Sequence, residues 1–193
     1  MEQKAVVRGQ RTREALCRAA VALVAERGWG GVSTRLVAER AGVPAGAVHY
    51  HFASLTDLLI DATAPLLARI TDEAVAALDA APDLPSGVDW LLGAVVRYSA
   101  DPAALRLPSE VFLAGTRHER LGGEFAALLA RFRASLAGWL TRCGRGAEAG
   151  AVATLLAAAL DGLLLHRAVD PAVEPRALIG VLRRLVAPTT GEE

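Results

Sequence analysis

The sequence predicts an all-α protein in which an N-terminal three-helix module, built on a helix-turn-helix, is joined to a C-terminal helical bundle, with about nine helices in total. Two observations support this prediction. Hydrophobic residues make up 53% of the chain but aromatic residues only 5%, so alanine and leucine supply the core, and both favour helix. Apolar residues recur at helical spacing, and no segment alternates as a half-buried strand does.

The N-terminal module is expected to hold three helices. Residues 11–26 carry an apolar stripe, and Gly28 follows as a stop. Ser33 is a good N-cap for a second helix that runs to about Ala41. Pro44 lies in the first turn of the third helix, where its missing N–H costs nothing.

A longer helix should follow, beginning at Ser54 or Thr56 and ending near Ala80, with Pro65 as a candidate kink. Prolines and glycines separate the other expected helices, at residues 86–100, 103–114, 118–142, 147–169 and 175–186. Order is expected to end at Pro188. These elements divide the chain into residues 1–53 and 54–193, which together are long enough to bury a core.

Residues 34–52 have the pattern of a DNA-reading helix-turn-helix. Ala38 is small enough for two helices to cross closely, and Gly42 can adopt the left-handed conformation that turns the chain. Three valines are apolar where they would face inward, namely Val37, Val43 and Val48. The second helix of the motif is then free to enter a major groove.

The run Ser-Thr-Arg at 33–35, the run 38–43, Gly46 and the ending Val-His-Tyr-His-Phe at 48–52 together resemble the TetR family of bacterial transcriptional repressors. The resemblance is dense over residues 10–62. It implies a cytoplasmic homodimer that represses transcription by binding a palindromic DNA operator. It also implies that a small-molecule effector binds in the C-terminal bundle and releases the DNA. A DNA-binding helical protein without a sensing role is the alternative.

Phosphate contacts are expected at the start of the second helix, where Ser33 and Thr34 offer hydroxyls and free N–H groups, although Ser33 also serves as a plain cap. By the resemblance, His49 takes the place of a phosphate-contacting tyrosine, and Leu55 that of a lysine. The complete set of DNA-binding candidates is Ser33, Thr34, Arg35, Pro44, Ala45, Gly46, Ala47, His49 and Tyr50.

Base reading should be unusual, because Ala45, Gly46 and Ala47 have no hydrogen-bonding side chains. Direct contacts then fall to Arg35, His49 and Tyr50. Arg11 and Arg13 are interpreted either as a flexible arm that enters a minor groove or as a solvated basic arm. Residues 1–60 hold eight basic and five acidic side chains, a small excess that suits a phosphate backbone and could also arise by chance.

The resemblance implies that the last two helices form a dimer interface. The candidates are Ala153, Ala157, Gly162, Leu178, Leu182 and Leu185, with intrachain packing of the same faces as the alternative. The candidates for an effector pocket are large side chains with an occasional polar group, Trp90, Tyr98, Phe112, Phe132, Trp139 and His166, each of which could instead be core.

The sequence argues against other classes of protein. No motif of a metalloprotease, phosphate-binding loop or serine hydrolase is present, so neither an enzyme nor a bound metal or cofactor is expected. No uninterrupted apolar run reaches a membrane-spanning length, and the N-terminus has no apolar signal core. Cys17 and Cys143 are expected to be reduced thiols.

Overall fold

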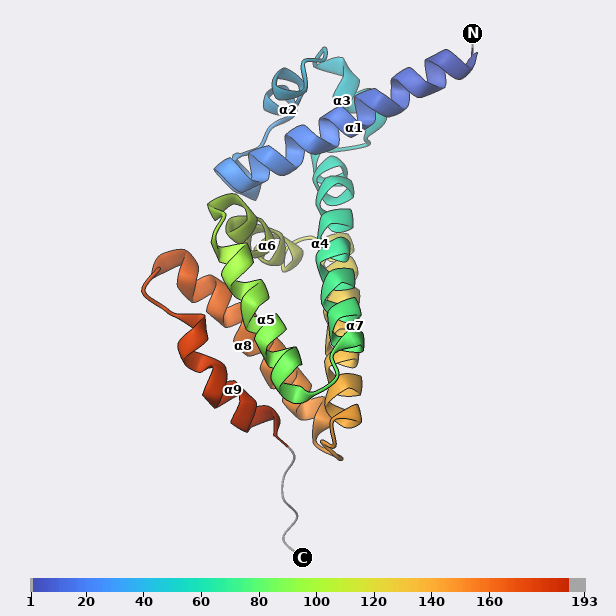
Figure 1. Cartoon of the computed structure of the whole chain (residues 1–193). Helices are drawn as coiled ribbons and strands as arrows, with labels where there is room; N and C mark the ends of the chain where they lie inside the picture. Colours follow the sequence, from blue (N-terminus) through green and yellow to red (C-terminus); the bar gives the residue numbers. More distant parts are fainter. Residues whose placement is uncertain (1, 188–193) are drawn as a thin grey trace, which may run out of the picture. The chain divides into compact units, whose positions relative to one another are not determined.

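The computed structural model describes residues 2–187, and the side chains of residues 6–101 and 105–187. Pro188, where order was expected to end, and the residues after it lie outside this part. Within it the fold is all-α, which confirms the predicted class (Figure 1). The helices are α1 (Glu2–Arg27), α2 (Thr34–Ala41), α3 (Gly46–His51), α4 (Leu55–Ala80), α5 (Leu84–Ser99), α6 (Pro102–Gly115), α7 (Glu119–Arg142), α8 (Ala149–Val169) and α9 (Ile179–Val186), with 3₁₀ turns η1 (Trp29–Gly31) and η2 (Pro175–Leu178).

The helices form two compact units. The first unit contains the chain up to Leu67 together with Arg106–Phe125, and the second contains Ala68–Leu105 together with the chain from Ala126 onward. Helices α4, α6 and α7 each contribute residues to both units. The division into a DNA-binding domain of residues 1–53 and a second domain of residues 54–193 stays a prediction.

The first unit packs α1 against α2 and α3 (Figure 1). Leu16, Val37 and Val48 are all fully buried and supply the apolar contact between the three helices. Ser33 caps α2 as predicted, since its Oγ accepts a hydrogen bond from the Leu36 N–H at 3.3 Å. Gly42 ends α2 with φ +67°, the left-handed conformation that the sequence predicted.

Two local expectations need adjustment. Helix α1 begins at Glu2 rather than near residue 11, because residues 2–10 contain no proline and continue the helix without a break. Ser54, rather than Thr56, caps α4, since its Oγ accepts a hydrogen bond from the Asp57 N–H at 3.0 Å. Pro65 lies within the continuous helix α4.

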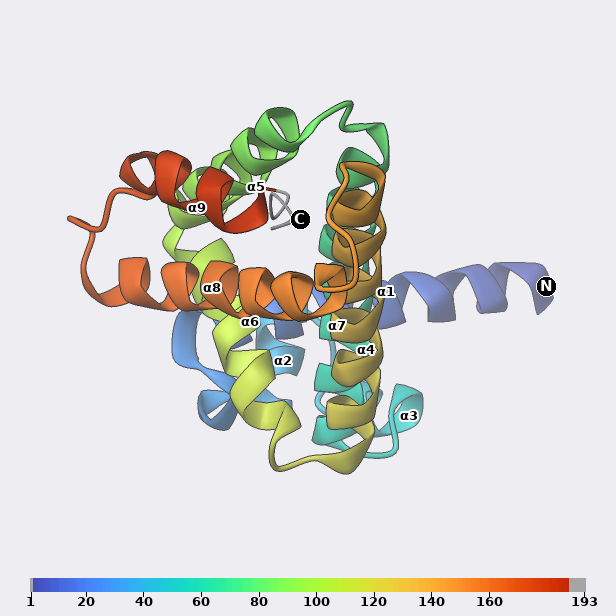
Figure 2. The same ribbon diagram turned by 90° about the horizontal axis from the view of Figure 1, so that it is seen from below.

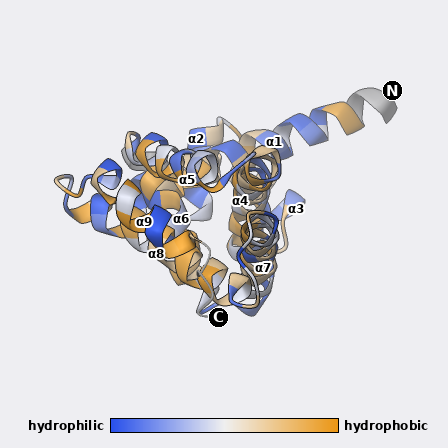
Figure 3. Cartoon of the chain, turned by 60° about the horizontal axis from the view of Figure 1, so that its bottom comes forward, coloured by the Kyte–Doolittle hydropathy of each residue, from blue (hydrophilic) through white to orange (hydrophobic). Residues whose placement is uncertain are grey.

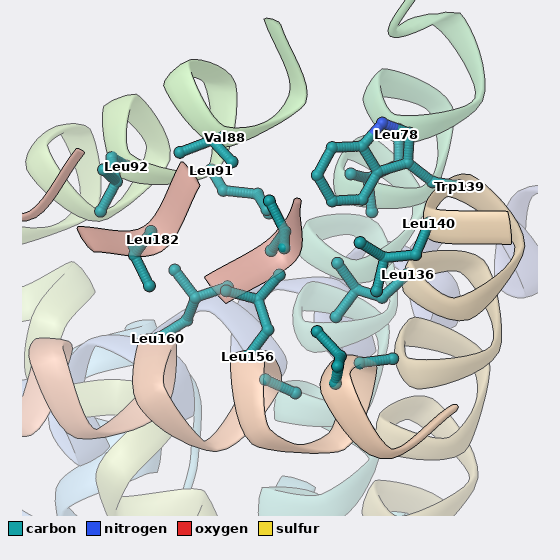
Figure 4. Close-up of a cluster of buried hydrophobic side chains, with 14 of the residues drawn as sticks. Leu78, Val88, Leu91, Leu92, Leu136, Trp139, Leu140, Leu156, Leu160 and Leu182 are labelled. Carbon is teal, nitrogen blue, oxygen red and sulfur yellow. The ribbon is translucent and has the colours of Figure 1, made fainter. Parts of the chain in front are cut away.

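The second unit places α5 against both α8 and α9 (Figure 2). Its core joins Leu78 of α4, four residues of α5, three of α7, and residues of α8 and α9 (Figure 4). Buried Arg145 donates to the carbonyl oxygens of Leu185 and Ala187 at the end of α9, where a helix presents unpaired acceptors. The predicted last helix is in fact η2 followed by α9, with Glu174 capping the 3₁₀ turn.

Helix α8 is the most apolar helix of the second unit (Figure 3). By length and composition it is the one helix of the described chain that could cross a membrane. One side of it packs into the core, where Ala153 and Leu156 are fully buried. The helix therefore has the character of a core helix, with a second apolar side that the single chain leaves uncovered.

Candidate nucleic-acid interface and effector region

Helix α3 exposes one face that no other part of the first unit covers. Val48 anchors the helix from its inner side and is fully buried. His49 and Tyr50 project outward, and Tyr50 keeps 84% of its surface accessible. Pro44 and Ala45 are exposed before the helix, and Ala47 is half-buried. A methyl group added to Gly46 would meet no atom within 4 Å. Packing therefore does not require this glycine, and another backbone could approach α3 closely there.

The start of α2 lies beside this face in the chain. Ser33 is exposed and Thr34 half-buried, as expected for groups near a helix N-terminus that could meet a phosphate. Arg35 is exposed and forms no ion pair or hydrogen bond within the part of the chain that the structure describes. By contrast, Arg13 and Arg40 are engaged by acids, Arg40 with Glu26 at 2.7 Å. Arg35 is thus a cation free to bind an external anion.

Of the two interpretations of Arg11 and Arg13, the flexible arm is wrong. Both residues lie inside helix α1, and the Arg13 Nη2 donates to Asp61 Oδ2 at 2.7 Å. Its guanidinium carbon also lies 4.9 Å from the centre of the Phe52 ring. Arg11 is exposed on the helix.

A charged cluster at the start of α4 was missed by sequence reasoning. Arg120 of α7 donates to Asp57 Oδ1 at 2.9 Å and to Asp61 Oδ1 at 2.5 Å. The hydrogen bond from Ser54, and then the hydrogen bond and the charge of Arg120, hold the pKa of Asp57 below its usual value. Asp57 and Asp61 stand one helical turn apart, which is a visible signal, but nothing in the sequence pairs them with a residue about 60 positions later.

The turn after α1 is fixed to α6. Glu110 Oε2 accepts a hydrogen bond from the Trp29 N–H at 2.8 Å, and the Trp29 ring lies 6.0 Å from that of His118. Gly28 precedes this contact with φ +76°. These contacts tie the N-terminal module to residues 106–125 within the first unit.

The six candidate pocket residues are divided between the two units, with Phe112 in the first and the other five in the second. Phe112 belongs to the first unit, is exposed, and stacks edge-on with Phe125 at 5.6 Å. His166 is exposed on α8. Trp90 lies beneath the Arg97 guanidinium, at 5.4 Å, and Phe132 packs against the core of the second unit.

Tyr98 and Trp139 are the two remaining pocket candidates. The Tyr98 hydroxyl donates to Glu73 at 3.2 Å, and burial raises the pKa of this phenol. Trp139 is fully buried within the core cluster (Figure 4). Its ring lies so close to Gly87 that a methyl group there would overlap it. Within the described part of the chain, the Trp139 Nε1 has no hydrogen-bond partner, and neither has the buried Ser135 Oγ one turn earlier.

Four of the six interface candidates are already used inside the chain, since Ala153, Ala157 and Leu182 belong to the core of the second unit and half-buried Leu185 packs against it. Leu178 and Gly162 are half-buried. The other side of α8 instead presents residues at alternating spacings of four and three, the pattern of a helix-pairing seam. These residues are Ala151, Leu155, Ala158, Gly162, Leu165 and Val169, and all but half-buried Gly162 are exposed.

Comparisons with known proteins match both parts of the chain. A family model described as bacterial regulatory proteins, tetR family, matches residues 16–62, and one described as tetracyclin repressor-like, C-terminal domain, matches residues 82–188. The HTH-type transcriptional regulator BetI of Rhizobium meliloti (strain 1021) is 28% identical over 163 residues, which are 83% of this chain and 79% of that protein.

Two solved structures are similar along nearly their whole length. The transcriptional regulator SCO7518 from Streptomyces coelicolor A3(2) has 31% identity and a TM-score of 0.70, covering 91% of this chain and 98% of its own. The multidrug binding protein EbrR, in complex with imidazole, has 27% identity and a TM-score of 0.71, covering 93% and 97%.

Proposed function

This chain belongs to the TetR family of bacterial transcriptional regulators, and from that premise we propose that it is a repressor that binds a palindromic operator as a homodimer. A small molecule bound in the second unit would release the DNA. The protein would act in the cytoplasm, where its operator is.

The observation that carries DNA binding is the uncovered face of α3 beside an unpaired Arg35. His49 and Tyr50 are exposed on that face while Val48 holds the helix from behind. Arg35 is the candidate for a bidentate contact with a base or a contact with a phosphate. Gly46 permits close approach, so part of the specificity would come from the shape of the groove.

Dimer formation is supported by the apolar seam on α8. Leu155 and Leu165 keep 55% and 50% of their surfaces accessible, and Val169 keeps 88%. A second copy of the seam is the partner of matching shape and chemistry, because a twofold axis brings the same face of each chain together. Two reading helices in such a dimer would bind half-sites about 34–36 Å apart.

Effector binding is supported by Ser135 Oγ, one of four buried side-chain atoms of the second unit that have no hydrogen-bond partner among the described residues. A buried donor that lacks an acceptor costs free energy, which a ligand oxygen could recover. We propose that Trp90, Tyr98 and Phe132 contribute to the same site. The multidrug binding of EbrR, as its name states it, makes a small organic ligand reasonable.

The test has two stages. Sequences that bind the protein are first selected from a pool of random duplex DNA. Fluorescence anisotropy then measures the affinity of the wild type and Arg35→Ala for the enriched operator. Specific binding should weaken steeply with salt, because arginine–phosphate contacts release counterions. A compound screen for release of the operator follows. Failure of every compound to release it would favour a DNA binder without a sensing role, and failure to enrich any sequence would disprove the proposed function.

A further inference from the structure

Asp61 lies at the centre of a charged cluster that connects three helices of the first unit. Each of its carboxylate oxygens accepts from a different arginine, Oδ2 from Arg13 of α1 at 2.7 Å and Oδ1 from Arg120 of α7 at 2.5 Å. Arg120 donates as well to Asp57, and its Nε to Glu124 at 3.2 Å. Asp61 is the member that joins Arg13 to the rest, and its side chain is only 25% exposed.

Arg13 connects this cluster to the end of the reading helix. Its guanidinium stands over the ring of Phe52, 4.9 Å from the centre, within the range of a cation–π contact. Phe52 is the C-cap of α3, is nearly fully buried, and donates its N–H to the Val48 carbonyl at 2.9 Å. Arg13 therefore contacts the residue at which α3 ends.

We propose that Asp61 and Arg120 are positioning residues for DNA binding, which hold Arg13 on Phe52 and thereby fix α3 for the major groove. Arg13 acts in the same way and contacts no phosphate. This inference rests on the proposed function, because it concerns how strongly the protein binds its operator.

The proposal predicts that removal of the Asp61 charge changes DNA affinity in the direction opposite to that expected from electrostatic repulsion alone. DNA repels a carboxylate, so removal of the Asp61 charge should strengthen DNA binding if electrostatics alone mattered. If Asp61 holds Arg13 in place, the Asp61→Asn variant should bind the selected operator more weakly. The expected loss is about tenfold, the size typical of residues coupled in one network.

The chain offers a matched control in Asp72→Asn. Asp72 also lies on α4 and pairs with an arginine of α7, Arg131, at the same sequence separation of 59 residues. That pair belongs to the second unit and includes no residue of α1 or α3. Asp72→Asn should leave operator affinity unchanged or slightly higher.

The experiment measures operator affinity by anisotropy at several salt concentrations for the wild type, Arg35→Ala, Asp61→Asn, Arg13→Met, the double variant and Asp72→Asn. Arg35→Ala should reduce the salt slope by about one, as loss of a phosphate contact does. Arg13→Met should weaken binding without changing the slope. Asp61→Asn should cost nothing further in the Arg13→Met background, because it acts through Arg13.

Several results would overturn the inference. They are equal or tighter operator binding by Asp61→Asn, a salt slope lowered by one in Arg13→Met, or additive losses in the double variant. Circular dichroism melts give the unfolding temperature of each variant, and each affinity is measured below it. If Asp61→Asn does not fold, Arg13→Met still tests the inference independently. Operator binding by the wild type with no effect of Asp61→Asn contradicts only this inference, whereas no specific binding by the wild type contradicts the proposed function as well.

Discussion

Glu110 accepts a hydrogen bond from the backbone N–H of Trp29 across 81 positions of sequence, at 2.8 Å. The carboxylate stands directly over Gly28, where both of its oxygens would lie 3.1 Å from an added methyl group. Gly28 has φ +76°, so the turn depends on a residue without a Cβ for two reasons, its conformation and the carboxylate above it.

Glu110→Ala should therefore destabilise the protein by about 1–3 kcal/mol, because a partly buried N–H loses its acceptor. Glu110→Gln keeps an acceptor oxygen and should cost less. Urea denaturation followed by circular dichroism gives both values, and hydrogen exchange at the Trp29 amide should accelerate in the alanine variant alone. Equal stability of the alanine variant and the wild type would show that water replaces the carboxylate at no cost.

Substitutions of Gly42 and Gly46 should distinguish an effect on folding from an effect on DNA binding. A methyl group at either position meets no atom within 4 Å, but only Gly42 has a positive φ. Gly42→Ala should cost about 1–2 kcal/mol of stability through backbone strain. Gly46→Ala should keep or raise stability, since alanine is the better helix former, while operator affinity falls because the added methyl group faces the DNA. Thermal melts and anisotropy test the pair, and unchanged affinity of Gly46→Ala would move the close approach elsewhere on α3.

Local signals were sufficient where one or two residues determine the structure. Ser33 as the N-cap and Gly42 as the left-handed end of α2 could be predicted because each acts on its own backbone. The order of the helices followed from glycines, prolines and apolar spacing. The early start of α1 could not be predicted, because its first residues lack the apolar stripe by which residues 11–26 were recognised.

Contacts between distant residues were beyond the sequence. Arg13 could be recognised as basic but not as the partner of Asp61, because that pairing depends on how α1 crosses α4. The small residues of α8 were recognised, but the helix has two apolar sides, and Ala153 and Ala157 belong to the inner one. Aromatic residues suggested a pocket, yet the fold distributes Phe112, Trp139 and His166 to different surroundings.

Gly87 and Trp139 should be the most sensitive pair in the second unit. The indole lies against the Gly87 backbone with no room for a side chain. Trp139→Ala should cost about 3–5 kcal/mol, as expected for a fully buried tryptophan, which makes it a poor probe of effector binding. Gly87→Ala should also lower the midpoint of urea denaturation, and Gly93→Ala on the same helix is the control, since its nearest neighbour is a flexible arginine tip. Equal midpoints for the two glycine variants would contradict the tight packing.

The cap of α4 should make stability depend on pH on the acid side. Ser54 and Arg120 lower the pKa of Asp57 from its ordinary 3.8, so the ionised group stabilises the fold. This contribution is complete above about pH 3.8 and is lost as pH falls through the lowered pKa. Ser54→Ala should cost about 1 kcal/mol at pH 7, with a smaller difference from the wild type under acid conditions. Urea denaturation across this pH range is the measurement, and a difference that does not change with pH would exclude Asp57 as the source.

Leu155 and Leu113 allow the proposed dimer seam to be tested against an exposed leucine outside it. Each keeps 55% of its surface accessible on a helix, Leu155 on the seam of α8 and Leu113 on α6. If the seam pairs two chains, Leu155→Glu places two carboxylates in an apolar interface, which should shift the protein to monomers in sedimentation experiments. Operator affinity should then fall, because a monomer engages only one half-site. Leu113→Glu should change neither property. A dimer that survives Leu155→Glu, with full operator affinity, would show that the two chains associate through another surface.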